Sequence, residues 1–383
     1  MAAQIAHSRS RKAVVTAAEA ALRLKKLVPS FSSSLHKGTM GRIGVVGGST
    51  DYTGAPFYAA ASSLRFGGDL AYVFCEKSAA SAIKSYSPEL MVTPFYSVDA
   101  LRDQSRAVAV TLGADVSSPS SSCPHPPSLS AAVIGPLLPR LHALVVGPGL
   151  GRDALLFGDL EALLQAAIRA GTPLVIDADG LAMLEGSMQV IRGYPWCVLT
   201  PNMVEFDRLV AQALVKLGLP GADPRSLCAG RSAEHVALLR QELQSGELAE
   251  RLRALCNALD HVTILVKGER DLVSRGGLVM EVTERGSPRR CGGQGDLLAG
   301  ALGVAAHWAH TGALLLPASA GEDKGADVDM DAESPLMLAC VLASLVVRRA
   351  AGLAFAAKHR STTTPDILEY LGEAFESIVP CEG

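Results

Sequence analysis

Short apolar segments alternate with longer helical segments along most of the chain. The short segments are three to six residues long and are apolar at nearly every position, rather than at every second position. A strand that is apolar on both sides is typical of a parallel sheet covered by helices on both faces. Strands are expected over residues 43–46, 70–75, 143–146, 174–176, 197–199, 263–266, 271–274 and 279–282.

The longer segments repeat their apolar positions with the period of a helix. Helices are expected over residues 55–66, 154–170, 204–215, 296–307, 335–358 and 364–375. A chain in which strand, loop and helix follow one another is an α/β protein, and it folds as a three-layer αβα sandwich with a mostly parallel central sheet. In that architecture ligands bind at the carboxyl ends of the strands.

Composition limits the classes of protein to which the chain can belong. Hydrophobic residues make up 49% of the 383 residues, so the chain can bury a large core and is not globally disordered. The net charge is −3 and aromatic residues make up 5%, which provides neither a broad basic face nor a stacking platform, so no nucleic-acid partner is expected. The longest apolar run, residues 336–347, ends at Arg348 and Arg349. It is shorter than the roughly 20 residues of a membrane span, so a buried core helix and no membrane partner are expected.

The first 34 residues form a segment of their own. Residues 1–30 contain six basic side chains and one acid, Glu19. This composition resembles an organellar transit peptide, and the spacing of Ala18, Leu22 and Leu27 equally allows a first helix over residues 15–27. The eight cysteines form no CxxC pair and indicate reduced thiols inside the cell. We expect a cytoplasmic protein, or a mitochondrial or plastid one if the segment is a transit peptide.

Residues 35–380 are expected to form one domain with three insertions. The insertions lie near residues 115–130, 217–246 and 317–333, and they are respectively rich in Ser and Pro, in Pro, Gly and charge, and in Asp. Such compositions are typical of surface loops. The acidic insertion lacks the residue order of a calcium-binding loop, so a solvated loop is favoured there.

Several strand ends carry glycine or polar residues. Residues 45–49 and 146–152 are glycine-rich, which lets the backbone approach a ligand or a phosphate, although either segment could be a tight structural turn. Asp177 and Asp179 follow another strand and could hold a metal, directly or through water, or one of them could be a helix N-cap.

Two further strand ends carry candidate ligand contacts. Asn202 and Glu205 have the spacing of a capping box, and Glu205 could also reach a metal through water. Lys267 and Gly268 could meet a phosphate or frame an adenine pocket, and the alternative is a plain β-hairpin turn.

The strongest candidate for chemistry is a glycine-rich turn, residues 292–295, that opens into an apolar helix. Free N–H groups and the helix dipole at such a position stabilise phosphate oxygens and the charge that develops in phosphoryl transfer. Asp296 stands at the helix start, where a carboxylate can take a proton from a substrate hydroxyl as its oxygen attacks phosphorus. A simple N-cap is the alternative, but the glycines and the preceding Arg289 and Arg290 favour chemistry.

Taken in order, these motifs resemble the ATP-dependent NAD(P)H-hydrate dehydratase family, in its eukaryotic branch. The matching segments, which span roughly residues 35–376, are 37–48, 52–56, 83–90, 147–153, 177–181, 199–206 and 289–296. The resemblance implies a ribokinase-like fold, with residues 35–380 as the catalytic domain. The chain carries neither a Walker-type P-loop nor a Gly-x-Ser-x-Gly elbow.

The resemblance also implies a reaction. The C6-hydrated coenzymes NADHX and NADPHX, in the S form, would be dehydrated to NADH and NADPH while ATP is cleaved to ADP and phosphate. Asp296 would deprotonate the C6 hydroxyl. The hydrate would be bound by Gly149, Gly151, Asn202, Met203, Val204, Glu205, Phe206, Asp207, Arg208 and Asp296. ATP would be bound by Lys267, Gly268, Glu269, Arg270, Asp271, Gly286, Ser287, Pro288, Arg289, Arg290, Cys291, Gly292, Gly293, Gln294 and Gly295. Mg²⁺ would bridge the phosphates, mostly through water, with no ligand assigned to it.

The partners implied are small molecules, together with an NAD(P)H-hydrate epimerase as functional partner, and a homo-oligomer is compatible with this assignment. Two other functions stay open on the residues alone. A ribokinase-like kinase for a vitamin precursor or a sugar would use the same turn but accumulate a phosphorylated product. A nucleotide-binding module without catalysis would have no need of Asp296.

Overall fold

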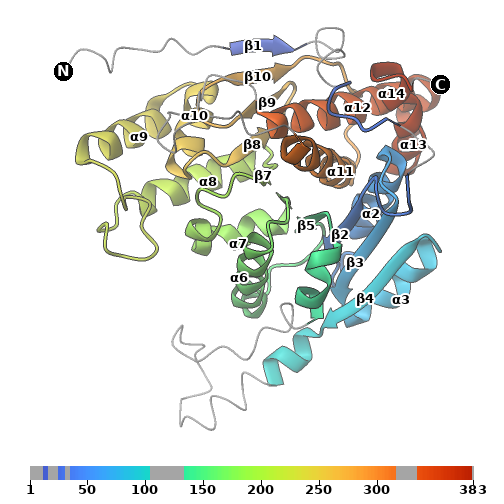
Figure 1. Cartoon of the computed structure of the whole chain (residues 1–383), viewed down its shortest axis with the longest axis horizontal. Coiled ribbons are helices and arrows are strands. Elements are labelled where there is room, and N and C mark those ends of the chain that lie inside the picture. The colour runs from blue at the N-terminus through green and yellow to red at the C-terminus, as the bar shows by residue number, and fades with distance from the viewer. Residues whose placement is uncertain (1–11, 16–24, 31–34, 104–132, 316–333, 382–383) are drawn as a thin grey trace.

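The computed structural model describes residues 12–15, 25–30, 35–103, 133–315 and 334–381. These residues form a ten-stranded sheet with helices packed on both of its faces (Figure 1). The strands are β1 (Lys12–Val15), β2 (Arg42–Val46), β3 (Leu70–Glu76), β4 (Leu90–Tyr96), β5 (Ala143–Val146), β6 (Leu174–Ile176), β7 (Cys197–Leu199), β8 (Thr263–Val266), β9 (Asp271–Ser274) and β10 (Val279–Val282). The α-helices are α2 (Gly54–Phe66), α3 (Lys77–Tyr86), α6 (Ala154–Arg169), α7 (Asp179–Ser187), α8 (Met203–Lys216), α9 (Ala233–Ser245), α10 (Leu248–Ala258), α11 (Gln294–Leu315), α12 (Pro335–Lys358), α13 (Thr364–Glu369) and α14 (Leu371–Ile378). Short 3₁₀ turns are η1 (Gly135–Arg140), η2 (Met188–Val190) and η3 (His359–Ser361).

The side chains of the central strands alternate between two hydrophobic cores, one on each face of the sheet. In β5, Ala143 and Val145 join the core formed with α2, α11 and α12. Leu144 and Val146 join the core formed with α6, α8 and α10. Because successive side chains of a strand point to opposite faces, a strand buried on both sides is apolar throughout. The predicted three-layer αβα sandwich is confirmed.

The order of the strands places a switch point between β5 and β2. The order is β1-β10-β9-β8-β7-β6-β5-β2-β3-β4, and neighbours are parallel except that β9 runs antiparallel to β8 and β10. The chain passes outward from β2 to β3 and β4, and then returns to β5 on the other side of β2. In open α/β sheets, ligands bind beside the carboxyl ends of the strands at such a point.

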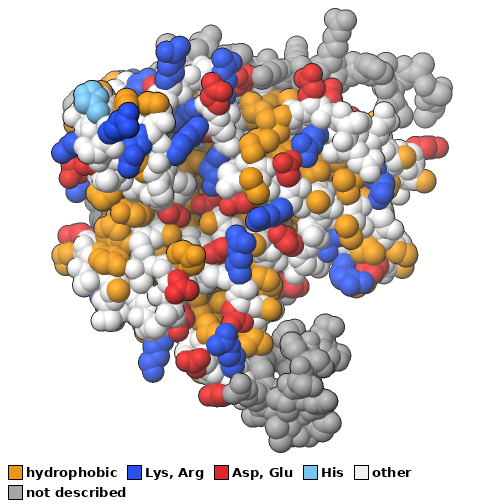
Figure 2. Space-filling model, turned by 180° about the vertical axis from the view of Figure 1, so that it is seen from behind, with side chains coloured by type: hydrophobic (Ala, Val, Ile, Leu, Met, Phe, Trp, Pro, Cys, Tyr) orange, Lys and Arg blue, Asp and Glu red, His pale blue; other side chains and the backbone are white. Residues whose placement is uncertain are grey.

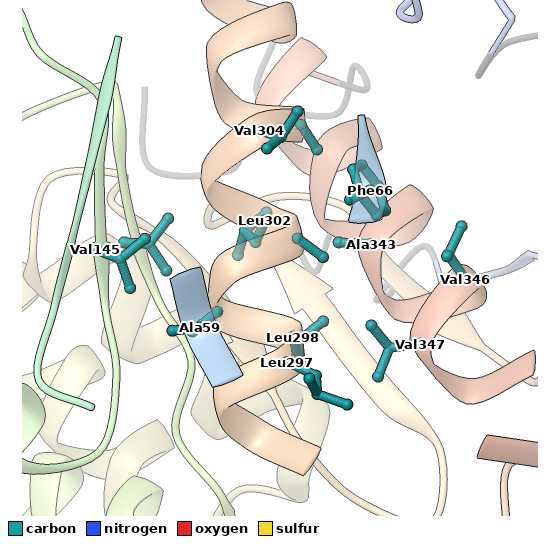
Figure 3. Close-up of a cluster of buried hydrophobic side chains, with 14 of the residues drawn as sticks. Ala59, Phe66, Val145, Leu297, Leu298, Leu302, Val304, Ala343, Val346 and Val347 are labelled. Atoms are coloured by element: carbon teal, nitrogen blue, oxygen red, sulfur yellow. The ribbon is translucent and has the colours of Figure 1, made fainter. Parts of the chain in front are cut away.

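Helix α11 is the central helix of one core. Figure 3 shows its side chains Leu298, Leu302 and Val304 between Val145 of the sheet and the side chains of α12. Helix α2 crosses α11 so closely at Gly300 that a Cβ atom there would lie 1.8 Å from the carbonyl oxygen of Ala59. This contact fixes α11, and with it the turn that precedes the helix, against α2.

Helix α12 is a core helix, as the sequence predicts. Within the described residues, the segment 335–361 is the one stretch whose length and mean hydropathy of 1.8 would suit a membrane span, and 72% of its most apolar window is buried inside the protein. It packs on α11, α14 and the strands β9 and β10. Its apolar residues are therefore accounted for by packing within the fold.

Charged side chains of both signs are mixed on the surface. Figure 2 shows Lys and Arg interspersed with Asp and Glu on the face seen from behind, among apolar side chains. Exposed pairs such as Arg225–Asp223 and Arg251–Asp207 bring opposite charges within 2.9 Å and 2.8 Å of each other. This face carries no broad surface of one sign, which a non-specific nucleic-acid binder would need.

The structure also corrects several expected elements. All eight expected strands are present, but β4 and β1 were not expected. β1 ends at Val15, the first residue of the helix that the sequence allowed over residues 15–27, and residues 16–24 of that expected helix lie outside the described residues. Helices α3, α7, α9 and α10 were also missed. The expected loop over residues 217–246 is wrong for its second half, which forms α9, and the expected helix over 364–375 is split into α13 and α14. The other two expected insertions lie almost wholly outside the described residues.

The crossing of α2 and α11 makes a prediction for stability. Gly300→Ala should lower the free energy of unfolding by about 1–3 kcal/mol, because its Cβ would overlap the backbone of Ala59. Gly312→Ala is a matched control in the same helix, because nothing lies within 4 Å of its added Cβ. The control should be neutral or more stable by up to about 1 kcal/mol. Urea denaturation measures both changes, and equal effects would contradict the close crossing.

Candidate active site

Two glycine turns meet at the switch point. The turn after β2 begins at Gly47, where a Cβ would lie 2.1 Å from the carbonyl oxygen of Pro148, and the N–H of Gly48 donates to that oxygen at 3.1 Å. Gly147 follows β5 with φ +126°, and its Cβ would lie 1.8 Å from the carbonyl oxygen of Asp177. These turns need glycine both for space and for backbone conformation. They bring the ends of β2, β5 and β6 into direct contact.

A buried ion pair links the ends of β6, β7 and β8. Asp177 is 1% exposed, and its Oδ1 accepts hydrogen bonds from Lys267 Nζ at 2.6 Å and from Thr200 Oγ1 at 2.8 Å. Burial acts to lower the pKa of Lys267, but the carboxylates of Asp177, Glu205 and Asp296 outweigh it and raise the pKa. Lys267 therefore stays a cation in this site. An isolated bridge between Asn202 and Lys267 adds a backbone link between the same strand ends.

Asp179 joins the second glycine turn to this cluster. Its carboxylate accepts a hydrogen bond from the N–H of Gly151 at 3.0 Å and pairs with Arg152 at 3.0 Å. Ala178, which separates it from Asp177, has φ +48°, a strained conformation for a residue with a side chain. Neither acid serves as the N-cap of α7, where the cap is Ala178 without a side-chain hydrogen bond, so the expectation that one of them caps this helix is wrong.

The glycine turn before α11 lies against the ion pair. Gly293 has φ +98° and packs against Tyr58 of α2, and a Cβ on Gly295 would lie 3.3 Å from Lys267 Nζ and 3.9 Å from Asp177 Oδ2. Helix α11 begins at Gln294, so Asp296 is the third residue of its first turn and not its N-cap. The N–H of Gln294 donates to the carbonyl oxygen of Cys291 at 3.5 Å, which leaves the N–H groups of Gly295 and Asp296 open to an anion beside Lys267.

Asp296 is the most perturbed carboxyl group of the site. Burial raises its pKa, the negative charges of Asp177 and Asp179 raise it further, and Lys267 opposes them, for a resulting pKa of about 7. Asp296 in turn raises the pKa of Tyr58, which burial also raises. A carboxyl group with a pKa near neutrality, placed beside free N–H groups and a lysine, is suited to remove a proton from a hydroxyl group.

A cavity of about 980 Å³ opens on one side of this turn. Most of the residues predicted to bind ATP line it, namely Lys267, Gly268, Glu269, Arg270, Asp271, Gly286, Ser287, Pro288, Arg290, Cys291, Gln294 and Gly295. Three others lie outside the lining: Arg289 donates to the carbonyl oxygen of Thr362, the carbonyl oxygen of Gly292 accepts from Thr364, and Gly293 packs on Tyr58 and Thr364. The β8–β9 segment is a hairpin turn, which confirms that interpretation, and it also forms a wall of the cavity, while its contact with a phosphate or an adenine stays a prediction.

The residues predicted to bind the hydrate lie on the other side of the turn and are less uniform. Gly149 packs against Tyr52, and Gly151 donates to Asp179. Asn202 and Glu205 form the capping box of α8, and Asn202 also lines the cavity. Met203, Val204 and Arg208 are exposed.

Two of these residues have other partners. Phe206 is fully buried in the core and lies under the guanidinium group of Arg251, 5.4 Å from the ring centroid. Asp207 forms an ion pair with the same Arg251 at 2.8 Å. The burial of Phe206 leaves its side chain no surface for a ligand, which corrects its expected contact with the hydrate, and its role in the fold is packing. The spacing of the motif did not distinguish this buried position from its exposed neighbours.

Several site residues were missed from the sequence. Tyr58, Thr200 and Arg348 lie at the site, but on a helix or behind a strand rather than in a glycine-rich segment. The cavity is also lined by Thr283, Glu284, Arg285, Leu298, Ser344, Val347 and Ala351. One indication was available: Arg348 interrupts an otherwise apolar helix, where a charge requires a partner.

Solved structures resemble the fold over nearly its whole length. A ribokinase-like superfamily protein from Enterococcus faecalis aligns with a TM-score of 0.60 and 17% identity, covering 96% of this chain and 97% of its own. An ADP/ATP-dependent NAD(P)H-hydrate dehydratase from Bacillus subtilis, co-crystallized with ATP/Mg²⁺, aligns with a TM-score of 0.57 and 17% identity, covering 94% and 97% of the two chains. At this level of identity the likeness establishes the ribokinase-like fold.

Closer relatives identify the family. The ATP-dependent (S)-NAD(P)H-hydrate dehydratase of Bos taurus is 40% identical over 356 residues, which is 93% of this chain and 88% of the relative. The enzymes of that name from Homo sapiens and Arabidopsis thaliana are 40% and 37% identical, over 93% and 95% of this chain and 83% and 86% of the relatives. The family model described as NAD(P)H-hydrate dehydratase matches residues 43–372. The chain therefore belongs to the NAD(P)H-hydrate dehydratase family.

Proposed function

We propose that this protein is an ATP-dependent dehydratase of the S forms of NADHX and NADPHX, and that it repairs damaged nicotinamide coenzymes. The observation that carries the proposal is the position of Asp296, whose carboxyl group has a pKa of about 7 and follows the glycine turn that borders the cavity. Membership of the family and the printed activity of its relatives support the same reaction. The cavity is large enough for a nucleotide.

The chemistry starts at the C6 hydroxyl group of the hydrate. Hydroxide is a poor leaving group, so direct loss of water from C6 is slow. Asp296 takes the hydroxyl proton while the oxygen attacks the terminal phosphorus of ATP, which forms a C6–O–P bond and breaks the bond to ADP. The lone pair of the ring nitrogen then expels phosphate from C6, and loss of a proton from C5 restores the double bond of the dihydronicotinamide.

The glycine turn and Lys267 serve the transferring phosphoryl group. The Lys267 ammonium group lies close to the start of α11, because a Cβ on Gly295 would be 3.3 Å from Lys267 Nζ. Asp177 and Thr200 hold Lys267 in place through the buried ion pair. Fixed donors of this kind stabilise charge in the transition state without having to reorganise.

Mg²⁺ is the metal that this chemistry implies, and the residues fit it through water. Across the part of the chain that the structure describes, no three His, Cys, Asp or Glu side chains are grouped closely enough to hold a metal ion by themselves. Mg²⁺ commonly keeps its waters and binds substrate phosphates with one or two carboxylates. Asp177, whose Oδ2 faces the glycine turn, would hold it through water, and the ion would neutralise phosphate charge.

The alternative, a small-molecule kinase, would begin with the same phosphoryl transfer, but the relatives and the family model are named as dehydratases. The two functions differ in the fate of the phosphorylated intermediate, which is stable in a kinase and eliminates phosphate here. The proposed substrate also explains the proposed epimerase partner: C6 of the hydrate is a stereocentre, so an enzyme specific for one form needs the other form to be converted. Cellular location and oligomeric state stay predictions.

The role of Asp296 is tested by Asp296→Asn. This variant should lose turnover of hydrated NADH with ATP and Mg²⁺ by about 10²–10⁴-fold, since the amide cannot accept the hydroxyl proton. ATP binding, measured by calorimetry, should be largely kept. Asp223→Asn is a matched control, because Asp223 pairs with Arg225 at the surface, and it should keep full activity. Turnover of Asp296→Asn near that of the wild type would contradict the assignment.

The raised pKa of Asp296 predicts how activity depends on pH. A general base works in its deprotonated form, so kcat/KM should fall about tenfold per pH unit below pH 7 and level off above it. Asp179→Asn should move this acidic limb to lower pH, because the charge of Asp179 helps to raise the pKa of Asp296. An acidic limb centred near pH 4 would show that the base is another group, or that Asp296 is not buried as described.

A further inference from the structure

Arg348 lies where the two walls of the cavity meet the core. It belongs to α12 and is 14% exposed, and its guanidinium group lines the cavity. Its N–H groups are directed at protein oxygens. Nη1 donates to Asp271 Oδ1 at 2.9 Å and to the carbonyl oxygen of Gly268 at 3.3 Å, and Nη2 donates to the carbonyl oxygen of Glu269. Gly268 and Glu269 belong to the loop between β8 and β9, and Asp271 is the first residue of β9.

The same side chain reaches the opposite wall. Arg348 Nε donates to the carbonyl oxygen of Glu284 at 2.7 Å, in the segment that follows β10. The backbone of Arg348 lies next to Gly286, where an added Cβ would come within 3.8 Å of it. One guanidinium group therefore ties together the 267–271 loop and the 283–288 segment, and both of these segments line the cavity.

Asp271 makes this connection rigid. Its side chain is 5% exposed, and it accepts from Arg348, from the N–H of Gly268 at 3.0 Å and from Ser344 Oγ at 2.7 Å. Ser344 is one helical turn before Arg348 on α12, so two residues of the core helix hold one buried carboxylate. A buried charge with several charge-assisted hydrogen bonds has one stable arrangement, which fixes the backbone around it.

We propose that Arg348 is the positioning residue of the nucleotide site, which it shapes by clamping the two walls of the cavity around ATP. The proposal rests on the assignment of this cavity to ATP. The loop that Arg348 holds begins at Lys267, and its fixed backbone sets how far Lys267 reaches toward Gly295. Arg348 makes four hydrogen bonds to the two walls and therefore acts mainly through those walls. The apolar side chains Leu298, Val347 and Ala351 offer a surface to the adenine base of ATP.

Two substitutions separate this role from a simple charge effect. Arg348→Met keeps the length of the side chain and removes every hydrogen bond to the walls. Arg348→Lys keeps the positive charge but cannot make the four bonds of the planar guanidinium group. Arg349→Met is the matched control, because Arg349 follows on the same helix and pairs with the side chain of Glu284 at 3.0 Å and with Ser377, so it contacts one wall of the cavity only and does not join the two walls.

Two measurements test the proposal. The first is steady-state kinetics in which ATP and hydrated NADH are varied separately, and the second is calorimetry of ATP binding to the free enzyme. Both Arg348 variants should raise the KM for ATP and the Kd for ATP by about 10–100-fold. The KM for the hydrate should change less than about twofold, and the acidic limb of the pH profile should stay in place. Arg349→Met should bind ATP like the wild type.

Three results would overturn the proposal. The first is an Arg348→Met protein that binds ATP as tightly as Arg349→Met, and the second is an Arg348→Lys protein that binds ATP like the wild type. The third is a rise of both KM values together with a fall of kcat, which indicates general damage to the fold. If Arg348→Met does not fold, Arg348→Lys and Ser344→Ala weaken the same network and carry the test. If the wild type binds ATP but does not dehydrate the hydrate, the proposed reaction fails while the role of Arg348 still stands.

Discussion

The site depends on an imbalance of buried charge. One lysine, Lys267, lies among the carboxyl groups of Asp177, Glu205 and Asp296, and its hydrogen bond to Asp177 is 2.6 Å long. Burial contributes most to raising the pKa of Asp296, and the charges of Asp177 and Asp179 raise it further against the opposing charge of Lys267. The pKa of Asp296 therefore lies near neutrality. The same arrangement holds Lys267 charged beside the glycine turn, so that the base and the phosphate-binding cation are maintained by one interaction.

The sheet creates this imbalance by bringing distant segments of the chain together. Asp177, Thr200 and Lys267 follow three neighbouring parallel strands, and the glycine turns after β2 and β5 pack so closely that a Cβ atom would overlap the opposite backbone. Helix α11 adds the fourth component, and its position is fixed by the close crossing with α2 at Gly300. The core thus determines where Asp296 lies relative to the strand ends. On the far side of the cavity, α12 supplies Arg348, which holds the walls together.

Much of this could be predicted from the sequence, and the limits have physical causes. Continuous apolar strands and glycine-rich ends are local patterns, so the sandwich, the eight strands and the turn before Asp296 were within reach. The interaction of Asp177 with Lys267 was not, because the two residues are 90 positions apart and a spacing along the chain says nothing about that contact.

Helix α7 was missed because Asp177 and Asp179 suggested a ligand-binding turn. Phe206 was placed in the site because it belongs to the 199–206 segment of the family resemblance, whereas the 3.6-residue period of α8 turns it into the core. Strand β4 contains Pro94 and partly polar residues, which hid an outer strand of the sheet.

The pKa of the Asp296 carboxyl group can be measured directly. The carboxyl carbons of the Asp residues can be followed by ¹³C NMR as a function of pH in the full-length protein without nucleotide, with Asp296→Asn to assign the resonance. We expect one aspartate resonance that titrates near pH 7 and is absent from the spectrum of the variant. A resonance of Asp296 that titrates near pH 4, like that of an ordinary exposed aspartate, would contradict the account, because the carboxyl group would then have neither the burial nor the neighbouring charges from which its role as the base is argued.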